Sequence, residues 1–467
     1  MPNSFFKKMN RIEFLKRLFL LLPTSSLAAS ILEGCDDTTT PNPSNGARTI
    51  LVIGAGMAGL AAARKLKQQG FKVTVLEARN RTGGRIWTDR SLGVPMDMGA
   101  SWIHGPGGSN PITSLAKEAK ATTFLTDDEA LMVYDEKGKR VEDTKLDDYY
   151  AQYTQLLKDI ASNGNGTKTV RDAIKEINSS YLTDLLMVWQ LSAYAEFDTG
   201  GDISLLSSRD WENDENFSGK DVLFPNGYDA ITDLLAKNLD VQLNQVVTKI
   251  DYSVVNKVSI VTDKTVFEGD AVVVAVPLGV LQQAKIAFQP NLDASKMTAI
   301  QQLKMGSTNK VALLFPATFW DNDAQYIGYT DAVKGKFNYF MNLNKFAPNT
   351  NGLMTFGFGK YSVALEKEND ATLQAEIMTT LKTIYGNAIP NPSKLLVSRW
   401  NSDPFALGAY SFAAVGSNAV DFTNLAMPVG KNLFFAGEHT NLEYRGTVHG
   451  AFLSGERAAE EVRVAFM

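Results

Sequence analysis

A glycine-rich turn between two short apolar segments constrains the fold of this chain most strongly. Residues 49–53 read TILVI, a continuous run of β-branched residues and leucine, as expected of a buried parallel strand. GAGMAG follows at once, then a helical stretch that ends at Gly70, and then a second strand, KVTVLEA, over 72–78. This order of strand, glycine turn, helix and strand predicts a Rossmann-like unit and an α/β fold.

The residues of this unit match the needs of a bound dinucleotide. Gly54 permits the tight turn, Gly56 lets the backbone approach a pyrophosphate, and Gly59 lets helix and strand pack closely. The helix N-terminus meets the phosphate charge, and Glu77 accepts from a ribose hydroxyl. GxGxxG alone is weak evidence, but strand, helix, second strand and acid all agree here. The sequence therefore predicts a dinucleotide site.

A basic stretch rich in glycine, RNRTGGRIWTDR, comes directly after the second strand and favours FAD over NAD. Arg85 can reach a pyrophosphate, and the glycine pair that includes Gly84 allows close approach of the backbone. Arg79 is a further candidate contact to the cofactor. Without the preceding motif, a solvated basic turn would be the better interpretation.

Several motifs resemble the flavin-containing amine oxidases: GAGMAGL, LEARNRTGGRIWT and DMGASWIHG. That family includes polyamine, spermine and monoamine oxidases and the catalytic domain of lysine-specific histone demethylase. The resemblance runs over residues 48–465 and implies FAD as cofactor. It also implies a Rossmann-like FAD-binding domain of three discontinuous segments and an α+β substrate-binding domain of mixed sheet and helices. The expected FAD segments are 48–110, 221–285 and 395–467, and the expected substrate segments are 111–220 and 286–394.

The resemblance implies oxidation of an amine by hydride transfer to flavin N5. The iminium would be hydrolysed to aldehyde and amine, and O2 would be reduced to H2O2. Lys310, in LKMGSTNKVALLF, would hold a water against flavin N5 and aid reoxidation, although a lysine entering a strand is usually a surface residue. Tyr410 matches the aromatic residue over the flavin face. Thr447 takes the place of a second aromatic ring, which widens the cleft and suits a secondary amine.

A C-terminal pair of motifs, FAGEHT and GTVHGAFLSG, resembles the family's second FAD motif. Glu438 would bind the ribityl hydroxyls, and the last helix would direct its N-terminus at the flavin. His439 and His449 would then be packing residues rather than acid–base catalysts. Ala409 stands where monoamine oxidases have a cysteine bonded to FAD, so the resemblance implies non-covalent FAD. The full set of expected cofactor contacts is Gly54, Gly56, Gly59, Glu77, Arg79, Gly84, Arg85, Gly99, Ala100, Ser101, Trp102, Val247, Trp400, Gly437, Glu438, Thr447 and Val448.

Two polar residues are candidates for contact with the substrate chain. His104, in WIHG, aligns with a substrate-facing residue of polyamine oxidases, and Glu196, in YAEFDTG, resembles the second polar position. A distal ammonium needs such a partner once it leaves water. A lone histidine is more often structural, and Glu196 could be an ordinary acid at a helix end. The run WENDE over 211–215 guides cationic amines or is simply a solvated acidic loop. The resulting prediction is a polyamine substrate of the spermine or spermidine type.

Other activities stay open at this point. A monoamine oxidase would have no use for His104 and Glu196. L-amino-acid oxidases place an arginine just after the glycine corresponding to Gly99, where this chain reads GASWIHG. A desaturase or isomerase would leave Lys310 without a clear task. A further alternative is a lipid-anchored protein that retains FAD without turnover.

Composition argues against several other classes of protein. The net charge of −5 gives no support for a nucleic-acid partner. The single cysteine, Cys35, rules out an intrachain disulfide, and three dispersed histidines do not supply a structural zinc site. We therefore expect no metal. The long helical insertion of the demethylase is absent, so a role in chromatin has no support.

The N-terminal segment predicts export. Residues 1–34 combine basic residues, a short apolar stretch and LEGC, which resembles a bacterial lipobox with an atypical glutamate. A polar tether over 35–47 follows. We expect a periplasmic or cell-envelope lipoprotein anchored at Cys35; cleavage near Ala28–Ala29 and retention in the cell stay open. RIEFLK resembles a twin-arginine motif with one arginine replaced by isoleucine, so the export route is undecided.

Overall fold

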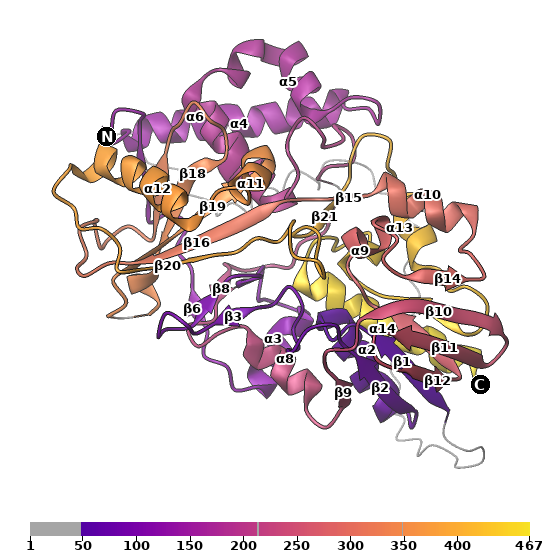
Figure 1. Cartoon of the computed structure of the whole chain (residues 1–467). Helices are drawn as coiled ribbons and strands as arrows, with labels where there is room; N and C mark the ends of the chain where they lie inside the picture. The colour runs from indigo at the N-terminus through magenta and orange to yellow at the C-terminus, as the bar shows by residue number, and fades with distance from the viewer. Residues whose placement is uncertain (1–47, 213, 348) are drawn as a thin grey trace.

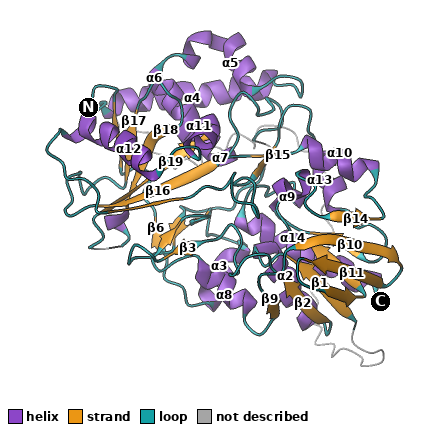
Figure 2. Cartoon of the chain, viewed as in Figure 1, coloured by secondary structure: helices purple, strands orange, loops and turns teal. Residues whose placement is uncertain are grey.

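A computed structural model describes residues 48–212, 214–347 and 349–467, and it contains two units of secondary structure (Figure 1). The expected export signal and tether lie outside the described residues. One unit is built around a parallel sheet, and the other around an antiparallel sheet with helices α4, α5, α6 and α12 nearby (Figure 2). Within the described part of the chain, no helix is long and apolar enough to cross a membrane.

The first unit contains a five-stranded parallel sheet in the order β22-β13-β1-β2-β9. Its strands are β1 (Thr49–Ile53), β2 (Lys72–Leu76), β9 (Asp240–Gln242), β13 (Ala271–Val274) and β22 (Leu433–Phe435). Residues 50–53 of β1 and all of β13 are apolar and buried because both faces of the sheet are covered. The Rossmann-like unit predicted from the sequence is confirmed by this topology.

The two faces of this sheet have different neighbours. Ile50 and Val52 pack with helices on one face, and Leu51 and Ile53 pack with a four-stranded sheet on the other. The helices are α2 (Met57–Gln68), α3 (Pro111–Glu118), α8 (Asp229–Ala236) and α14 (Val448–Ala465). The second sheet has the order β12-β11-β10-β14, with β10 (Val247–Val254), β11 (Lys257–Thr262), β12 (Val266–Gly269) and β14 (Ala287–Gln289). Helices α2 and α14 come from opposite ends of the chain and lie side by side (Figure 1).

The second unit is built on a six-stranded sheet in the order β20-β16-β19-β18-β17-β7. Neighbouring strands are antiparallel except β17 and β7. The strands are β7 (Leu131–Tyr134), β16 (Thr308–Leu314), β17 (Tyr326–Tyr329), β18 (Lys336–Asn342), β19 (Gly352–Phe358) and β20 (Lys394–Val397). The segments KVALLF and LMTFGFG form the adjacent strands β16 and β19, as predicted.

Helices and short elements complete this unit and link it to the first one. The helices are α4 (Asp143–Asn163), α5 (Val170–Asn178), η1 (Ser179–Leu182), α6 (Leu185–Gln190), the π-helical turn η2 (Leu191–Glu196), α7 (Phe197–Thr199), η3 (Leu343–Lys345), α11 (Gly359–Leu365) and α12 (Asp370–Tyr385). Helices α9 (Leu278–Gln282), α10 (Ala294–Gln302) and α13 (Ala419–Ala426) pack in the first unit. The other short elements are β3 (Thr88–Asp89), β4 (Met96–Asp97), β5 (Trp102–Ile103), β6 (Phe124–Leu125), β8 (Val222–Leu223), β15 (Lys304–Met305), β21 (Ser411–Phe412) and η4 (Glu438–Thr440).

The chain passes between the two units more than once. The segments 48–110, 221–285 and 395–467 supply all strands of the parallel sheet. However, β14 and α10 follow the expected boundary at 285 and still belong to this unit, because β14 pairs with β10 and α10 packs against α13. That boundary was therefore placed too early, and the other boundaries stay predictions.

Candidate active site

A cavity of about 650 Å³ runs from the glycine turn after β1 to the six-stranded sheet. Residues from both units line it, so it lies where they meet. All the residues predicted for the site line this cavity except Gly59 and Glu196. Those that do are Gly54, Gly56, Glu77, Arg79, Gly84, Arg85, Gly99, Ala100, Ser101, Trp102, His104, Val247, Lys310, Trp400, Tyr410, Gly437, Glu438, Thr447 and Val448.

The glycine turn has no space for side chains except toward the cavity. A Cβ on Gly54 would lie 2.8 Å from the carbonyl oxygen of Ala275, and one on Gly59 would lie 1.9 Å from that of Gly54. Gly56 is different, because only the carbonyl oxygen of Gly83 comes within 4.0 Å of its ideal Cβ. Gly59 therefore serves the packing of helix on strand, and Gly56 leaves room for a bound group.

Glu77 directly follows β2, and its carboxylate faces the glycine turn that follows β1. It accepts hydrogen bonds from the backbone N–H of Ala55 at 2.7 Å and of Arg79 at 2.8 Å. Burial raises the pKa of this carboxyl, and the two backbone N–H groups oppose that effect. The Arg79 guanidinium forms a two-point ion pair with Asp403, at 2.8 and 2.7 Å. Arg79 thus lines the cavity with its charge already paired.

Glu438 connects four segments at the centre of the cavity wall. Its carboxylate accepts from Arg85 Nη1 at 2.8 Å, from the backbone N–H of Gly446 at 3.0 Å and from the hydroxyl of Ser411. Arg85 also donates to the carbonyl of Ala409 at 2.9 Å. Burial would raise the pKa of Glu438, but Arg85 and its other partners outweigh burial and lower it below the usual value. The carboxylate therefore stays ionised although it is buried.

The N-terminus of α14 opens into the same cavity. Thr447 is the N-cap, since its hydroxyl accepts from the backbone N–H of Gly450 at 2.9 Å. The same hydroxyl donates to the carbonyl of Tyr444 at 2.7 Å. Thr447 and Val448 line the cavity, so the positive end of the helix dipole faces it. The structure gives the Thr447 hydroxyl a capping contact and no additional catalytic partner among the described residues.

Lys310 lies on β16 with its side chain buried rather than at the surface. Its ammonium donates to the carbonyls of Asp97 at 2.8 Å and Gly99 at 2.6 Å, and to the hydroxyl of Ser101. Burial lowers the pKa of Lys310 below its usual value, and the nearby Asp97 carboxylate opposes that effect. The lysine therefore fixes the 97–101 loop at the point where this loop lines the cavity.

Two aromatic residues form the neighbouring part of the wall. Tyr410 is buried, pairs through its hydroxyl with Thr308 at 3.1 Å and donates to the carbonyl of Phe197. Trp400 is also buried and donates from Nε1 to the carbonyl of Met98 at 3.2 Å. Because each ring is held by a polar partner from another segment, its position in the cavity wall is fixed.

Comparison with known proteins settles the family. The model of the family described as flavin containing amine oxidoreductase matches residues 57–463. The chain belongs to this family. "Probable polyamine oxidase 4" of Arabidopsis thaliana is 35% identical over 457 residues, covering 93% of this chain and 91% of that protein. "Polyamine oxidase 5" of Oryza sativa subsp. japonica is 34% identical over 89% of this chain and 87% of its own length.

Two further relatives complete the comparison. "Lysine-specific histone demethylase 2" of Homo sapiens is 32% identical over 89% of this chain but only 53% of its own length. The solved structure of a redesigned putrescine oxidase shares the fold, with a TM-score of 0.73 and 21% sequence identity. The match covers 89% of this chain and 99% of that chain. These matches confirm the family resemblance and the fold class predicted from the sequence.

The protein is therefore an amine oxidase of the flavin-containing family, and FAD is its cofactor. The cavity fits this cofactor on three grounds already described. Gly56 leaves room beside the βαβ turn, Glu77 offers carboxylate oxygens, and the α14 N-terminus faces the cavity. When bound, FAD supplies the acceptor for the hydride that leaves the amine.

The two C-terminal histidines of this amine oxidase do not line the cavity. His439 is 1% exposed and His449 is 3% exposed. Burial lowers the pKa of His439 to about 4 and that of His449 to about 3. The His449 ring packs edge-on against Phe217 and Tyr444. Both rings are neutral at pH 7 and serve as packing residues in this arrangement.

The far end of the cavity is acidic. His104 is half-exposed, stacks on Trp102 and pairs through Nδ1 with Asp221 Oδ2 at 2.7 Å. Carboxylates that line the same cavity are Asp128, Asp198, Glu212, Asp214 and Asp221. Sequence reasoning found only Glu212 and Asp214 among these five. The others carry no motif, because their place in the wall depends on contacts between segments far apart in the sequence.

Glu196 corrects a sequence prediction. It is fully buried, forms an ion pair with Lys334 and accepts from the backbone N–H of Ile203 at 2.9 Å. Asp202 pairs with the same lysine at 3.0 Å. The predicted contact of Glu196 with the substrate cavity is therefore wrong. Glu196 is the last residue of the π-helical turn η2, and Asp198, two residues further along, lines the cavity.

Exchange of each acid for its amide separates these two roles. In Glu196→Gln we expect an unchanged KM for the amine and a loss of roughly 1–3 kcal/mol of stability, because a buried ion pair is broken. In Asp198→Asn we expect KM to rise about tenfold, because a carboxylate facing a cation is removed. Steady-state oxygen consumption and thermal unfolding measure the two quantities. A rise in KM in Glu196→Gln alone would contradict the structural assignment.

Proposed function

We propose that this amine oxidase acts on a polyamine of the spermine or spermidine type, with non-covalent FAD and O2 as acceptor. The products are an aldehyde, an amine and H2O2. The observation that carries the proposal is the combination of an aromatic region and an acidic end in one cavity. A polyamine alternates methylene segments with ammonium groups, so it needs apolar surface and carboxylates along one path. Relatives named polyamine oxidases support this choice.

Each region of the cavity has a separate task in this proposal. Tyr410, Trp400 and Trp102 contact the reacting part of the amine and orient its C–H bond toward the cofactor. His104 and Asp221 hold a distal ammonium, because a cation removed from water requires a charged or hydrogen-bonding partner. Lys310 positions the water that assists reoxidation of the cofactor. FAD stays non-covalent because Ala409 precedes Tyr410 and the chain's one cysteine is Cys35.

Competing substrates fit the cavity less well. An apolar monoamine has no use for the five carboxylates Asp128, Asp198, Glu212, Asp214 and Asp221 that line the cavity. An L-amino acid needs a cationic partner for its carboxylate, and the stretch after Gly99 supplies none. Arg445 does line the cavity, but it already pairs with Asp214 and with backbone carbonyls. The charge of the cavity thus favours a substrate with more than one cationic centre.

Anaerobic reduction of bound FAD tests the substrate class directly. Spermine, spermidine, acetylated polyamines, putrescine, benzylamine and several L-amino acids are mixed separately with the enzyme, and the visible flavin absorbance is followed. We expect rapid bleaching by spermine or spermidine and slow or no bleaching by benzylamine and the amino acids. Fast bleaching by benzylamine or an amino acid, with none by the polyamines, would overturn the proposal. A flavin that no amine bleaches would support a protein that retains FAD without turnover.

We further propose that the protein is exported and anchored to the cell envelope through Cys35. The bases are the sequence features of residues 1–34 and the polar tether that follows. Cys35→Ala in the full-length chain should move the protein from the membrane fraction of a bacterial host to a soluble fraction. An unchanged distribution between the fractions would contradict lipid anchoring.

A further inference from the structure

The loop before β8 crosses the cavity as a strap. We define the strap as residues 207–212 and 214–218; Asn213 lies outside the described residues. Its side chains Trp211, Glu212, Asp214 and Asn216 line the cavity. The strap has no helix or strand of its own within these residues, so its position depends on contacts with neighbouring segments.

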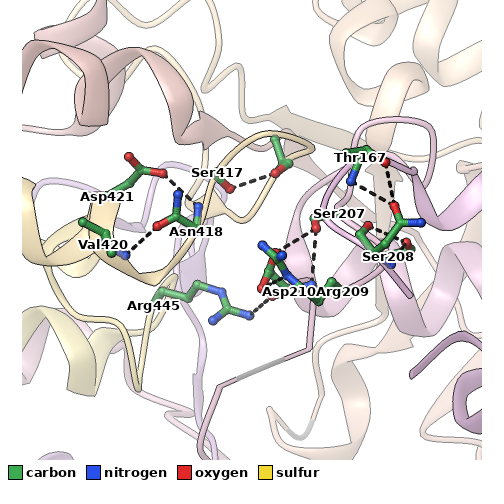
Figure 3. Close-up of polar contacts among 12 residues, drawn as sticks. Thr167, Ser207, Ser208, Arg209, Asp210, Ser417, Asn418, Val420, Asp421 and Arg445 are labelled. Carbon is green, nitrogen blue, oxygen red and sulfur yellow. Dashed lines mark hydrogen bonds and ion pairs between the residues drawn. The ribbon is translucent and has the colours of Figure 1, made fainter. Parts of the chain in front are cut away.

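Arg445 makes several polar contacts to the strap with one side chain (Figure 3). Its guanidinium Nη2 donates to the carbonyl of Asp210 at 3.0 Å and to that of Trp211 at 3.2 Å. The same nitrogen lies 3.3 Å from Asp214 Oδ1. The Arg445 side chain is 5% exposed, and its residue lies two positions before Thr447, the N-cap of α14. One side chain thus joins the strap to the segment that opens the flavin motif.

The strap has other attachments besides Arg445: its first residues, Ser207 and Ser208, bond to neighbouring segments, and so do residues nearer its other end. The backbone N–H of Glu215 donates to the carbonyl of Glu443 at 2.7 Å, and the ring of Phe217 stacks on Tyr444 with centroids 4.9 Å apart. At its far end, the carbonyl of Ser218 accepts from the backbone N–H of Gly107 at 2.7 Å, next to the loop that carries His104. The strap therefore spans the cavity from the α14 N-terminus to the His104 loop.

We propose that Arg445 is a positioning residue, which fixes the strap across the substrate side of the cavity and so sets its affinity for the amine. The guanidinium suits this task because its Nη2 reaches all three strap acceptors while Nη1 donates to the carbonyl of Leu442 at 3.5 Å, and the single ammonium nitrogen of lysine cannot reproduce both sets of contacts. Without Arg445, the backbone carbonyls of Asp210 and Trp211 would lose this hydrogen-bond donor. Arg445 also compensates the Asp214 charge, so this part of the wall is close to neutral.

This inference rests on the proposed function only in that an amine enters this cavity. Asp214 faces two charged groups on other elements, Arg445 before α14 and Asp198 of α7. Burial raises the pKa of Asp214 and Arg445 lowers it, which agrees with a carboxylate paired inside the wall. Loss of Arg445 would leave this carboxylate and two carbonyls without their partner, and the strap would lose its attachment beside the flavin motif.

The test compares Arg445→Met and Arg445→Lys with Arg209→Met in the FAD-loaded, full-length protein. Arg209 belongs to the same strap and pairs with Asp210 on the exposed side, so its loss should matter little. We expect KM to rise about tenfold in Arg445→Met and about threefold in Arg445→Lys, because hydrogen bonds to the strap are lost. The values of kcat and FAD content should stay within about twofold of wild type, and KM of Arg209→Met should do so as well.

Limited proteolysis provides a readout that needs no substrate. Trypsin should cleave after Lys220 faster in both Arg445 variants than in Arg209→Met, and mass spectrometry locates the cut. Phe217→Leu removes the stacking contact with Tyr444 and should also raise KM and speed cleavage. If Arg445→Met folds poorly, Arg445→Lys and Phe217→Leu still carry the test. Unchanged KM and cleavage in the Arg445 variants would overturn the proposal. So would a loss of FAD with a lower kcat at unchanged KM.

Failure of the polyamine proposal would be distinguishable from failure of this one. KM ratios are measured with whichever amine reduces the FAD of the wild-type enzyme, so they do not depend on that amine being spermine. Cleavage after Lys220, two residues beyond the strap, requires no substrate. If the wild-type enzyme prefers another amine but the Arg445 variants show the expected KM ratios and faster cleavage, the proposed role of Arg445 stands.

Discussion

The ion pair between Arg85 and Glu438 is the contact on which the rest of the site depends. It joins two residues 353 positions apart, one after the βαβ unit and one after the last strand of the parallel sheet. The same carboxylate accepts from Ser411 and Gly446, so it also orders the segment that carries Tyr410 and the N-cap of α14. A buried carboxylate without these donors would be too costly to keep ionised. The C-terminal motif is therefore the opposite wall of a site that begins at the glycine turn.

The cavity is a consequence of how the chain passes between its two units. The parallel sheet places its turn at one end, and β16 of the antiparallel sheet brings Lys310 to the loop at 97–101. The acidic end forms where the His104 loop and the strap meet. Two rigid sheets thus hold the cofactor side in place, while a loop without regular structure forms part of the substrate side. Because of this division, the contact that Arg445 makes to the strap can set the affinity for the amine without altering the chemistry, as proposed above.

Local patterns predicted the βαβ unit, and the family resemblance supplied the rest of the fold and most of the cofactor side of the site. The strand TILVI, the glycine turn and Glu77 form one short unit, so spacing alone placed them correctly. Lys310 was found through its family resemblance, although a lysine entering a strand indicates a surface residue by itself. Glu196 was predicted from a motif resemblance, and a motif does not show that Lys334, 138 residues away, pairs with this carboxylate. Asp128, Asp198 and Asp221 were missed because only tertiary contacts bring them together, and β14 was assigned to the wrong unit for the same reason.

The affinity of Glu438→Gln for FAD tests the central role of this ion pair most directly. Glutamine has the same shape but cannot balance Arg85, and its amide group turns a donor toward Ser411 or Gly446. The measurement is a titration of deflavinated protein with FAD, with Glu461→Gln as a control, since Glu461 pairs with Arg457 away from the cavity. We expect FAD affinity to fall at least about tenfold in Glu438→Gln and to stay at the wild-type value in Glu461→Gln. Equal affinity in Glu438→Gln and wild type would contradict the idea that this carboxylate assembles the site.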